Sequence, residues 1–160
     1  TILSLGSGPA FLERMLVKLG IKQENITLSD IDPEILPADF KSVNVDINGD
    51  WENLKEEKFD LIIFPESYLA VSLREDSVGI DGEQFFGQLD KQNKKKEDDL
   101  YKTIVQSLKH LKDGGVIRIT GHAGHVYEDI VSAVTQRLAQ EGQTVEISYR
   151  KSLVEIKKKN

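Results

Sequence analysis

The chain has 160 residues, the length of one ordinary domain. It carries 21 basic and 27 acidic residues, a net charge of −6, with charged residues at 30% and hydrophobic residues at 39%. This balance is typical of a globular protein and argues against a disordered chain or a protein that coats nucleic acid through a basic surface. The absence of cysteine excludes disulfides, thiolate zinc sites and cysteine nucleophiles.

No stretch is apolar over the roughly 20 residues that a helix needs to cross a bilayer, so we expect no membrane span and no membrane partner. No secretory signal peptide is visible either, and we expect a cytoplasmic protein. We therefore expect a single domain over residues 1–160, with a polar insertion at about 74–99.

The first predicted elements are a strand, a glycine turn and a helix. Residues 2–5 form an apolar run typical of a short strand, and the turn GSGPA follows at residues 6–10. From Phe11 onward apolar residues recur at helical spacing, and Gly20 ends the helix. The residues predicted on its apolar face are Leu12, Met15, Leu16 and Leu19.

Three further strands are predicted before the middle of the chain. Residues 26–29 form the second strand, which a turn closes at residues 30–33, where Asp32 is expected to act as a turn or cap residue. Residues 42–47 form a short third strand that carries Asp46 near its end. Residues 59–64, with the sequence FDLIIF, are typical of a strand buried on both faces of a parallel sheet.

The second half of the chain begins with the polar insertion, and a connection of that length is usually functional or disordered. We interpret its lysine run at residues 94–96 as a solvated, mobile face. A helix is then predicted from the spacing of Leu100, Ile104, Val105, Leu108 and Leu111. A strand at 116–120, a helix at 127–140 and an antiparallel hairpin of residues 144–149 and 152–156 complete the chain.

Alternating strands and helices of this kind predict an α/β fold, an open and mostly parallel sheet of about seven strands with helices on both faces and an antiparallel strand near the C-terminus. Ligands of such sheets bind outside the carboxyl ends of the strands. Gly6 and Gly8 lie at the end of the first strand, Asp30 at the end of the second and Asp46 at the end of the third, so all four are expected along one crevice.

The glycine turn permits close approach of the backbone to a ligand, and the following helix offers free N–H groups at its N-terminus. Asp30 follows Gly8 by 22 residues, where a carboxylate can accept both ribose hydroxyls of a nucleoside. Two simpler interpretations stay open. The glycines can serve only a tight turn, and Asp46 can cap the turn near Asn48 and Gly49.

The ordered motifs ILSLGSGPAFLE, TLSDIDPEIL, VNVDI, FDLIIFPES and LKHLKDGGVIRIT, which span nearly the whole chain, resemble those of the class I S-adenosylmethionine-dependent methyltransferases. The resemblance implies a Rossmann-like three-layer sandwich with S-adenosylmethionine as cofactor. It departs from the family's usual pattern at Ser4, where an acidic residue is common, and at Ala10, where glycine is common and a slightly wider turn is expected.

The resemblance also implies roles for individual residues. Backbone around Gly6, Ser7 and Gly8 would meet the methionine part of the cofactor, and Asp30 would hold the ribose hydroxyls. The remaining implied contacts are Ile31 against adenine, Asp46 with the exocyclic amine of adenine, and Phe64 with Pro65 as the floor near the sulfonium. No metal site is implied.

Methyl transfer from a sulfonium is an in-line displacement at an activated carbon, so positioning and desolvation supply much of the catalysis. An acceptor with a proton to lose would use a general base, and the candidates are Glu66, Tyr68, His122 and His125. Capping or solvent-exposed roles for the two histidines are the simpler interpretation. We expect a small-molecule or protein acceptor, since the fourth strand lacks the motif of amino-methylating nucleic-acid enzymes.

Two alternatives to a methyltransferase remain. The glycine turn and Asp30 would also suit an NAD-dependent oxidoreductase, although Phe11 stands where the dinucleotide fingerprint has glycine or alanine. A methyltransferase fold retained only as a non-catalytic binding module would equally explain Ser4 and the weak signature of an acceptor site. The sequence does not indicate an oligomeric state.

Overall fold

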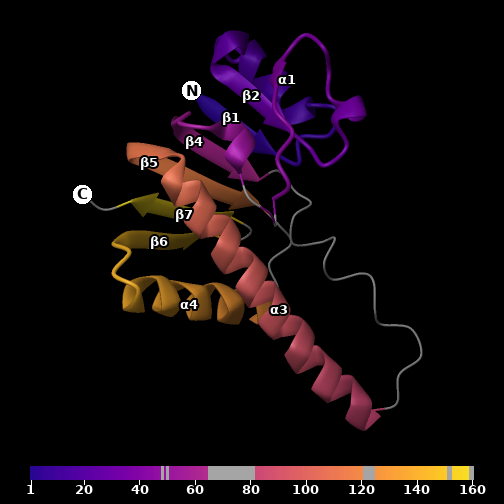
Figure 1. The fold of residues 1–160 in the computed structure, drawn as a ribbon, viewed down its shortest axis with the longest axis vertical. Helices are drawn as coiled ribbons and strands as arrows, with labels where there is room; N and C mark the ends of the chain where they lie inside the picture. Colours follow the sequence, from indigo (N-terminus) through magenta and orange to yellow (C-terminus); the bar gives the residue numbers. More distant parts are fainter. Residues whose placement is uncertain (48, 50, 65–81, 121–124, 151–152, 159–160) are drawn as a thin grey trace.

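The computed structural model describes residues 1–47, 49, 51–64, 82–120, 125–150 and 153–158 (Figure 1). These residues form a seven-stranded sheet in the order β3-β2-β1-β4-β5-β7-β6. The strands are β1 (Ile2–Leu5), β2 (Ile26–Ser29), β3 (Lys41–Ser42), β4 (Phe59–Phe64), β5 (Leu111–Thr120), β6 (Val145–Arg150) and β7 (Leu153–Lys158). Strands β1 to β5 pair in parallel, whereas β7 is antiparallel to both β5 and β6. The predicted α/β sheet is therefore confirmed.

Helices cover both faces of the sheet, as the three-layer prediction requires (Figure 1). They are α1 (Phe11–Lys18), α3 (Gly82–Lys109) and α4 (His125–Gln140), with the short 3-10 turns η1 (Gln23–Asn25), η2 (Pro33–Ile35) and η3 (Glu52–Leu54). Side chains alternate along a strand, so β4 sends Ile62 into the core under α3 and α4 and Ile63 into a second cluster under α1. None of the helices formed by the described residues combines the length and apolar character that a membrane crossing requires.

The third strand is shorter than the 42–47 predicted, since only Lys41 and Ser42 pair regularly with β2. The N–H of Val43 still donates to the backbone carbonyl of Leu28 at 2.9 Å, but the backbone pairing does not continue to Val45. The N–H of Val45 donates instead to the side-chain hydroxyl of Ser29 at 3.1 Å. Asp46 consequently lies in the loop beyond the strand rather than at the strand's end.

The polar insertion is helical where it is described. Residues 82–99, predicted as part of a functional or disordered connection, extend α3 into a single helix of 28 residues. Glutamine, glutamate, lysine and leucine are good helix formers, and no proline interrupts them. Lys94 and Lys95 are exposed on this helix, as a solvated face requires, while Lys96 is half-buried and its pKa is lowered by that burial.

The boundary between α3 and β5 also differs from the prediction. Leu111 was expected on the apolar face of the helix, yet it is the first residue of β5 and pairs with Phe59. A bulge in the β4–β5 pairing and the left-handed conformation of Gly114, with φ of 74°, let the strand continue through the glycine pair to the predicted 116–120 segment.

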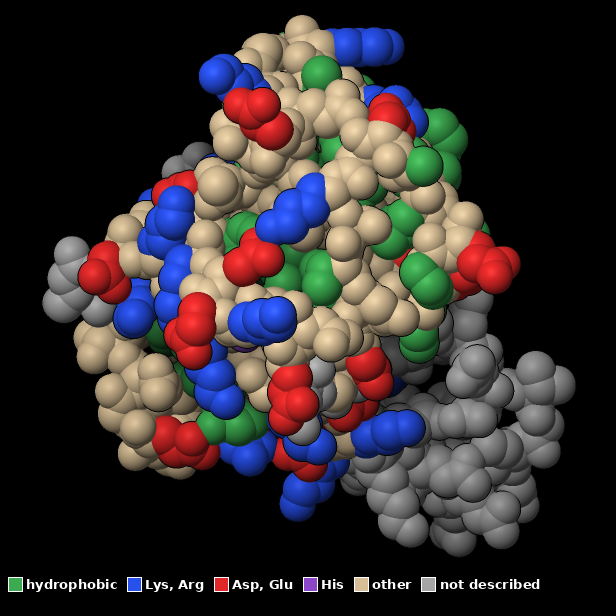
Figure 2. Space-filling view, turned by 45° about the horizontal axis from the view of Figure 1, so that its top comes forward, with side chains coloured by type: hydrophobic (Ala, Val, Ile, Leu, Met, Phe, Trp, Pro, Cys, Tyr) green, Lys and Arg blue, Asp and Glu red, His purple; other side chains and the backbone are tan. Residues whose placement is uncertain are grey.

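Helix α1 presents a different face to the sheet than predicted. Of its predicted apolar face only Leu16 is partly buried against the sheet, while Leu12, Met15 and Leu19 are 39%, 59% and 79% exposed. The helix instead turns Glu13, Leu16 and Val17 inward, a set that has equally good helical spacing. Figure 2, which brings the α1 end of the molecule forward, shows hydrophobic side chains at the surface among charged ones.

Candidate functional site

The glycine turn between β1 and α1 is held by backbone hydrogen bonds to the neighbouring strand. The N–H groups of Gly6 and Ser7 both donate to the carbonyl of Ser29, at 2.8 and 3.0 Å. Gly6 and Gly8 have φ of 73° and 51°, a left-handed conformation that favours glycine. The end of β2 thus fixes the shape of the turn before any ligand binds.

Ala10, the last residue of the turn, also adopts the left-handed conformation, with φ of 59°. The chain therefore keeps at this position the conformation that glycine favours. Such a conformation costs an alanine about 1–2 kcal/mol. The methyl group of Ala10 is fully buried in the cluster under α1, which offsets part of that cost.

Asp30 is joined directly to the glycine turn. Its Oδ2 atom accepts the N–H of Gly8 at 2.9 Å, and its Oδ1 atom accepts the N–H of Asp32 at 3.2 Å. The two residues that the sequence spacing linked are therefore in contact, at the carboxyl ends of β1 and β2. Asp30 is half-buried, and a carboxylate has about four acceptor sites, so it retains capacity for the hydroxyls of a ligand.

The residues after Asp30 differ sharply in role. The Ile31 side chain is 79% exposed beside the carboxylate, which is where a flat ring would find apolar surface. Asp32 accepts the N–H of Glu34 at 3.1 Å and caps η2, which confirms its prediction as a cap residue.

Asp46 lies on a turn of its own. The N–H of Gly49 donates to the Asp46 carbonyl at 3.0 Å, and a Cβ placed on Gly49 would lie 3.0 Å from the Asp46 Oδ2 atom. The Asp46 carboxylate therefore packs over the glycine of that turn. The sequence left two roles open for Asp46, capping this turn and contacting adenine. The contact with Gly49 favours the first role.

Phe64 stands at the carboxyl end of β4, as predicted, with its side chain 1% exposed in the core. Its carbonyl accepts the hydroxyl of Thr120 at 3.0 Å, which ties the ends of β4 and β5 together. Pro65, Glu66, Tyr68 and His122 lie outside the described residues, and His125 begins α4.

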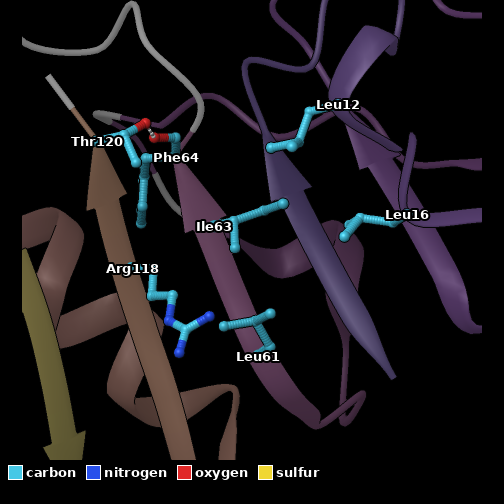
Figure 3. A pocket seen from close by; sticks show the side chains of 7 residues that line it. All are labelled: Leu12, Leu16, Leu61, Ile63, Phe64, Arg118 and Thr120. Carbon is cyan, nitrogen blue, oxygen red and sulfur yellow. Dashed lines mark hydrogen bonds between the residues drawn. The ribbon is translucent and has the colours of Figure 1, made fainter. Parts of the chain in front are cut away.

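A cavity of about 150 Å³ opens on the α1 side of the sheet. Its walls come from α1, β4 and β5, and its lining residues are Leu12, Leu16, Leu61, Ile63, Phe64, Arg118 and Thr120 (Figure 3). The lining is almost entirely apolar. Arg118, the one charged residue among these lining residues, donates from its Nε atom to Glu155 at 2.9 Å. The hydrogen bonds from Lys157 and Arg118 lower the pKa of Glu155.

Glu13 is the polar residue near the turn that sequence reasoning did not find. It lies in the first turn of α1 and is fully buried between the helix and the sheet. Its Oε1 atom accepts the hydroxyl of Ser4. Apolar spacing cannot signal a buried carboxyl, because that spacing treats glutamate as a solvent-facing residue. Within the described part of the chain, no three histidine, aspartate or glutamate side chains gather as metal ligands.

No protein-family model matches the sequence, and a search of curated proteins found no relative. Solved structures do match. The glycopeptide N-methyltransferase MtfA, crystallised with sinefungin, aligns over 97% of this chain and 84% of its own, with a TM-score of 0.56 and 13% identity. MtfA was also crystallised with S-adenosylmethionine and with S-adenosylhomocysteine.

Two further structures agree with MtfA. The ribosomal protein L11 methylase from Lactobacillus delbrueckii subsp. bulgaricus aligns over 99% of this chain and 70% of its own, with a TM-score of 0.54 and 16% identity. A methyltransferase from Pyrococcus furiosus aligns over 98% and 72%, with a TM-score of 0.53 and 16% identity. The chain therefore has the Rossmann-like fold of the class I S-adenosylmethionine-dependent methyltransferases.

Proposed function

We propose that the protein is an S-adenosylmethionine-dependent methyltransferase that binds its cofactor at the carboxyl ends of β1 and β2. The hydrogen bond between the Gly8 N–H and Asp30 carries this proposal, because it places a glycine turn and a ribose-type acceptor side by side. The approach to Gly8 is also open, since a Cβ built on this residue meets no atom within 4 Å.

Each part of the cofactor has a candidate partner. Asp30 would accept the ribose hydroxyls, Ile31 would cover the adenine ring, and Asp46 would accept the adenine amine. The methionine carboxylate would meet the backbone of Gly6, Ser7 and Gly8 and the N-terminus of α1, where the cap residue Ala10 offers no side-chain hydrogen bond. The ends of β4 and β5, with Phe64 and Pro65, would face the sulfonium.

The bound cofactor supplies a methyl group on a positively charged sulfur, an already activated carbon for in-line displacement. The chain then has to orient an acceptor, exclude water and remove a proton where the acceptor carries one. We assign the proton transfer to Glu66, Tyr68 or His122 and the acceptor to the small-molecule or protein class, in the cytoplasm. Two structural neighbours are named for a glycopeptide and a ribosomal protein, which is compatible with both acceptor classes.

Calorimetric titration with S-adenosylhomocysteine tests the proposal, with NADH as the competing ligand. We expect saturable binding of S-adenosylhomocysteine and none of NADH. Binding of NADH alone would favour the oxidoreductase, and a folded protein that binds neither ligand would exclude the methyltransferase. Turnover is then measured with S-adenosylmethionine and pooled small-molecule and protein acceptors. Cofactor binding without any turnover would favour the non-catalytic module.

A further inference from the structure

The Glu13 carboxyl group is buried, and one of its two oxygen atoms has no hydrogen-bond partner within the part of the chain that the structure describes. Its side chain has no exposed surface, and its Oε1 atom accepts the hydroxyl of Ser4. Its Oε2 atom has no hydrogen-bond partner among the described residues. Burying a carboxylate without a compensating charge or hydrogen bond is costly, so a fold that keeps this group gains something from it.

Glu13 is connected to the glycine turn through Ser4. The hydroxyl of Ser7, in the turn, donates to the Ser4 carbonyl at 2.8 Å, and the Ser4 hydroxyl donates to Glu13. Asp30 contacts the same turn at Gly8. Two carboxyl groups therefore support one turn, Asp30 through Gly8 and Glu13 through Ser4 and Ser7.

We infer that Glu13 is the residue that recognises the ammonium group at the amino-acid end of the cofactor, an inference that rests on the proposed function. With Asp30 holding the ribose, the amino-acid end would lie along the rest of the turn, beside Ser7, whose hydroxyl donates to the Ser4 carbonyl. That end carries an ammonium group, a donor of the charge and kind that an unpartnered carboxylate oxygen requires. The hydroxyl of Ser4 holds the Glu13 carboxylate in place for this contact.

The test compares two ligands that differ only at this end. S-Adenosylhomocysteine carries the ammonium group, whereas 5′-methylthioadenosine is a nucleoside thioether without the amino-acid part. In Glu13→Gln we expect the affinity for S-adenosylhomocysteine to fall about tenfold or more, because a charged hydrogen bond is lost. We expect the affinity for 5′-methylthioadenosine to change less than twofold. Equal losses for both ligands, or no loss for either, would overturn the inference.

A second variant separates binding from folding. Glu13→Met replaces the carboxyl by an apolar side chain of similar length. Without ligand, we expect this variant to have an equal or higher melting temperature than the unaltered protein. We also expect it to lose affinity for S-adenosylhomocysteine but not for 5′-methylthioadenosine. A lower melting temperature with unchanged relative affinity for the two ligands would assign Glu13 a purely structural role. Glu24→Gln, at an exposed glutamate in η1, is the matched control and should leave both affinities unchanged.

The outcome for the unaltered protein separates this inference from the proposed function. If the unaltered protein binds neither nucleoside, the proposed function fails and the role of Glu13 fails with it. If it binds both nucleosides and the glutamine variant does not discriminate between them, only the role of Glu13 fails.

Discussion

The backbone N–H of Gly8 donates to the Asp30 carboxylate over 2.9 Å, although 22 residues separate the two in the sequence. This bond joins the turn after β1 to the end of β2, the place where open parallel sheets bind their ligands. Asp30 therefore positions the turn, and in the proposed function it also accepts the ribose hydroxyls.

Replacing Asp30 by alanine should weaken the binding of S-adenosylhomocysteine by roughly 1–3 kcal/mol, because the ribose hydroxyls lose a charged acceptor. Calorimetric titration measures the change. Asp32→Ala is the control, since it removes the cap of η2 and should cost about 0.5–2 kcal/mol of stability while leaving affinity nearly unchanged. Equal affinities for Asp30→Ala and the unaltered protein would show that Asp30 only shapes the turn.

Gly8→Ala should separate conformational strain from occupation of the site. Gly8 and Gly142 both have positive φ, 51° and 75°, and a Cβ on either meets no atom within 4 Å. Alanine at either position should lower stability by about 1 kcal/mol, or about 2–4 °C in melting temperature. Only Gly8→Ala should also reduce the affinity for S-adenosylhomocysteine, by tenfold or more, because its methyl group would project into the space proposed for the ligand. If both variants bound S-adenosylhomocysteine with the same affinity, the ligand would not lie next to Gly8.

Glu155 should give the fold a small pH dependence in acid. Hydrogen bonds from Lys157 and Arg118 lower its pKa below the ordinary value of 4.5. A carboxyl group with a lowered pKa stabilises the folded state above its unfolded pKa, and this stability is lost as the pH falls through the folded value. We expect a contribution of no more than about 1 kcal/mol, since the partners are largely exposed.

The measurement is urea unfolding of the unaltered protein and of Glu155→Gln at several pH values. The difference in free energy of unfolding between the two proteins should be constant at neutral pH and shrink as the pH falls below about 4.5. Glu56→Gln, at an exposed loop glutamate, should show no such trend. A difference that grows toward low pH would contradict the assignment.

The exposed apolar residues on α1 and directly after it should contribute little to folding. Leu19 and Met15 are 79% and 59% exposed, so replacing either by glutamine should change the free energy of unfolding by less than about 0.5 kcal/mol. Leu16→Ala, which removes a side chain packed against the sheet, should cost about 2–3 kcal/mol. A large loss for Leu19→Gln would show that the outer face of α1 is covered in solution, and sedimentation velocity would test for self-association.

The sequence predicts β1 and β2 at their observed bounds because each is a short run with a strong turn signal behind it. It also predicts that Gly8 and Asp30 lie along one edge of the sheet, since the carboxyl ends of parallel strands share an edge. The hydrogen bond between them is visible only in the structure. The strands β6 and β7 of the hairpin each begin one residue later than predicted. The alternation of side chains specifies that the two strands pair, but it specifies their first and last residues less well. These elements depend on local patterns of apolar residues and turn signals.

Other features depend on contacts that a local pattern does not contain. Regular pairing of β3 stops before Val45, whose N–H bonds to the Ser29 side chain instead of the backbone. The face of α1 that turns inward includes Glu13, whose partner Ser4 lies on β1. The extension of α3 through residues 82–99 follows from helix propensity, yet a polar stretch without apolar periodicity is equally typical of a loop. The length of β3, the inward face of α1 and the extension of α3 each depend on contacts between different elements of the fold.

The carbonyl of Ser29 accepts both N–H groups at the start of the glycine turn, so this part of the turn is specified by main-chain atoms of a neighbouring strand. Main-chain atoms are the same in every residue, and a loop held in this way tolerates drift in its side chains provided that the left-handed residues stay compatible. Sequence comparison depends on the identity of side chains, so it stops detecting such a turn once the side chains have diverged. Comparison of backbones retains it, which accounts for a chain that aligns with solved methyltransferases at 13–16% identity while no family model matches it.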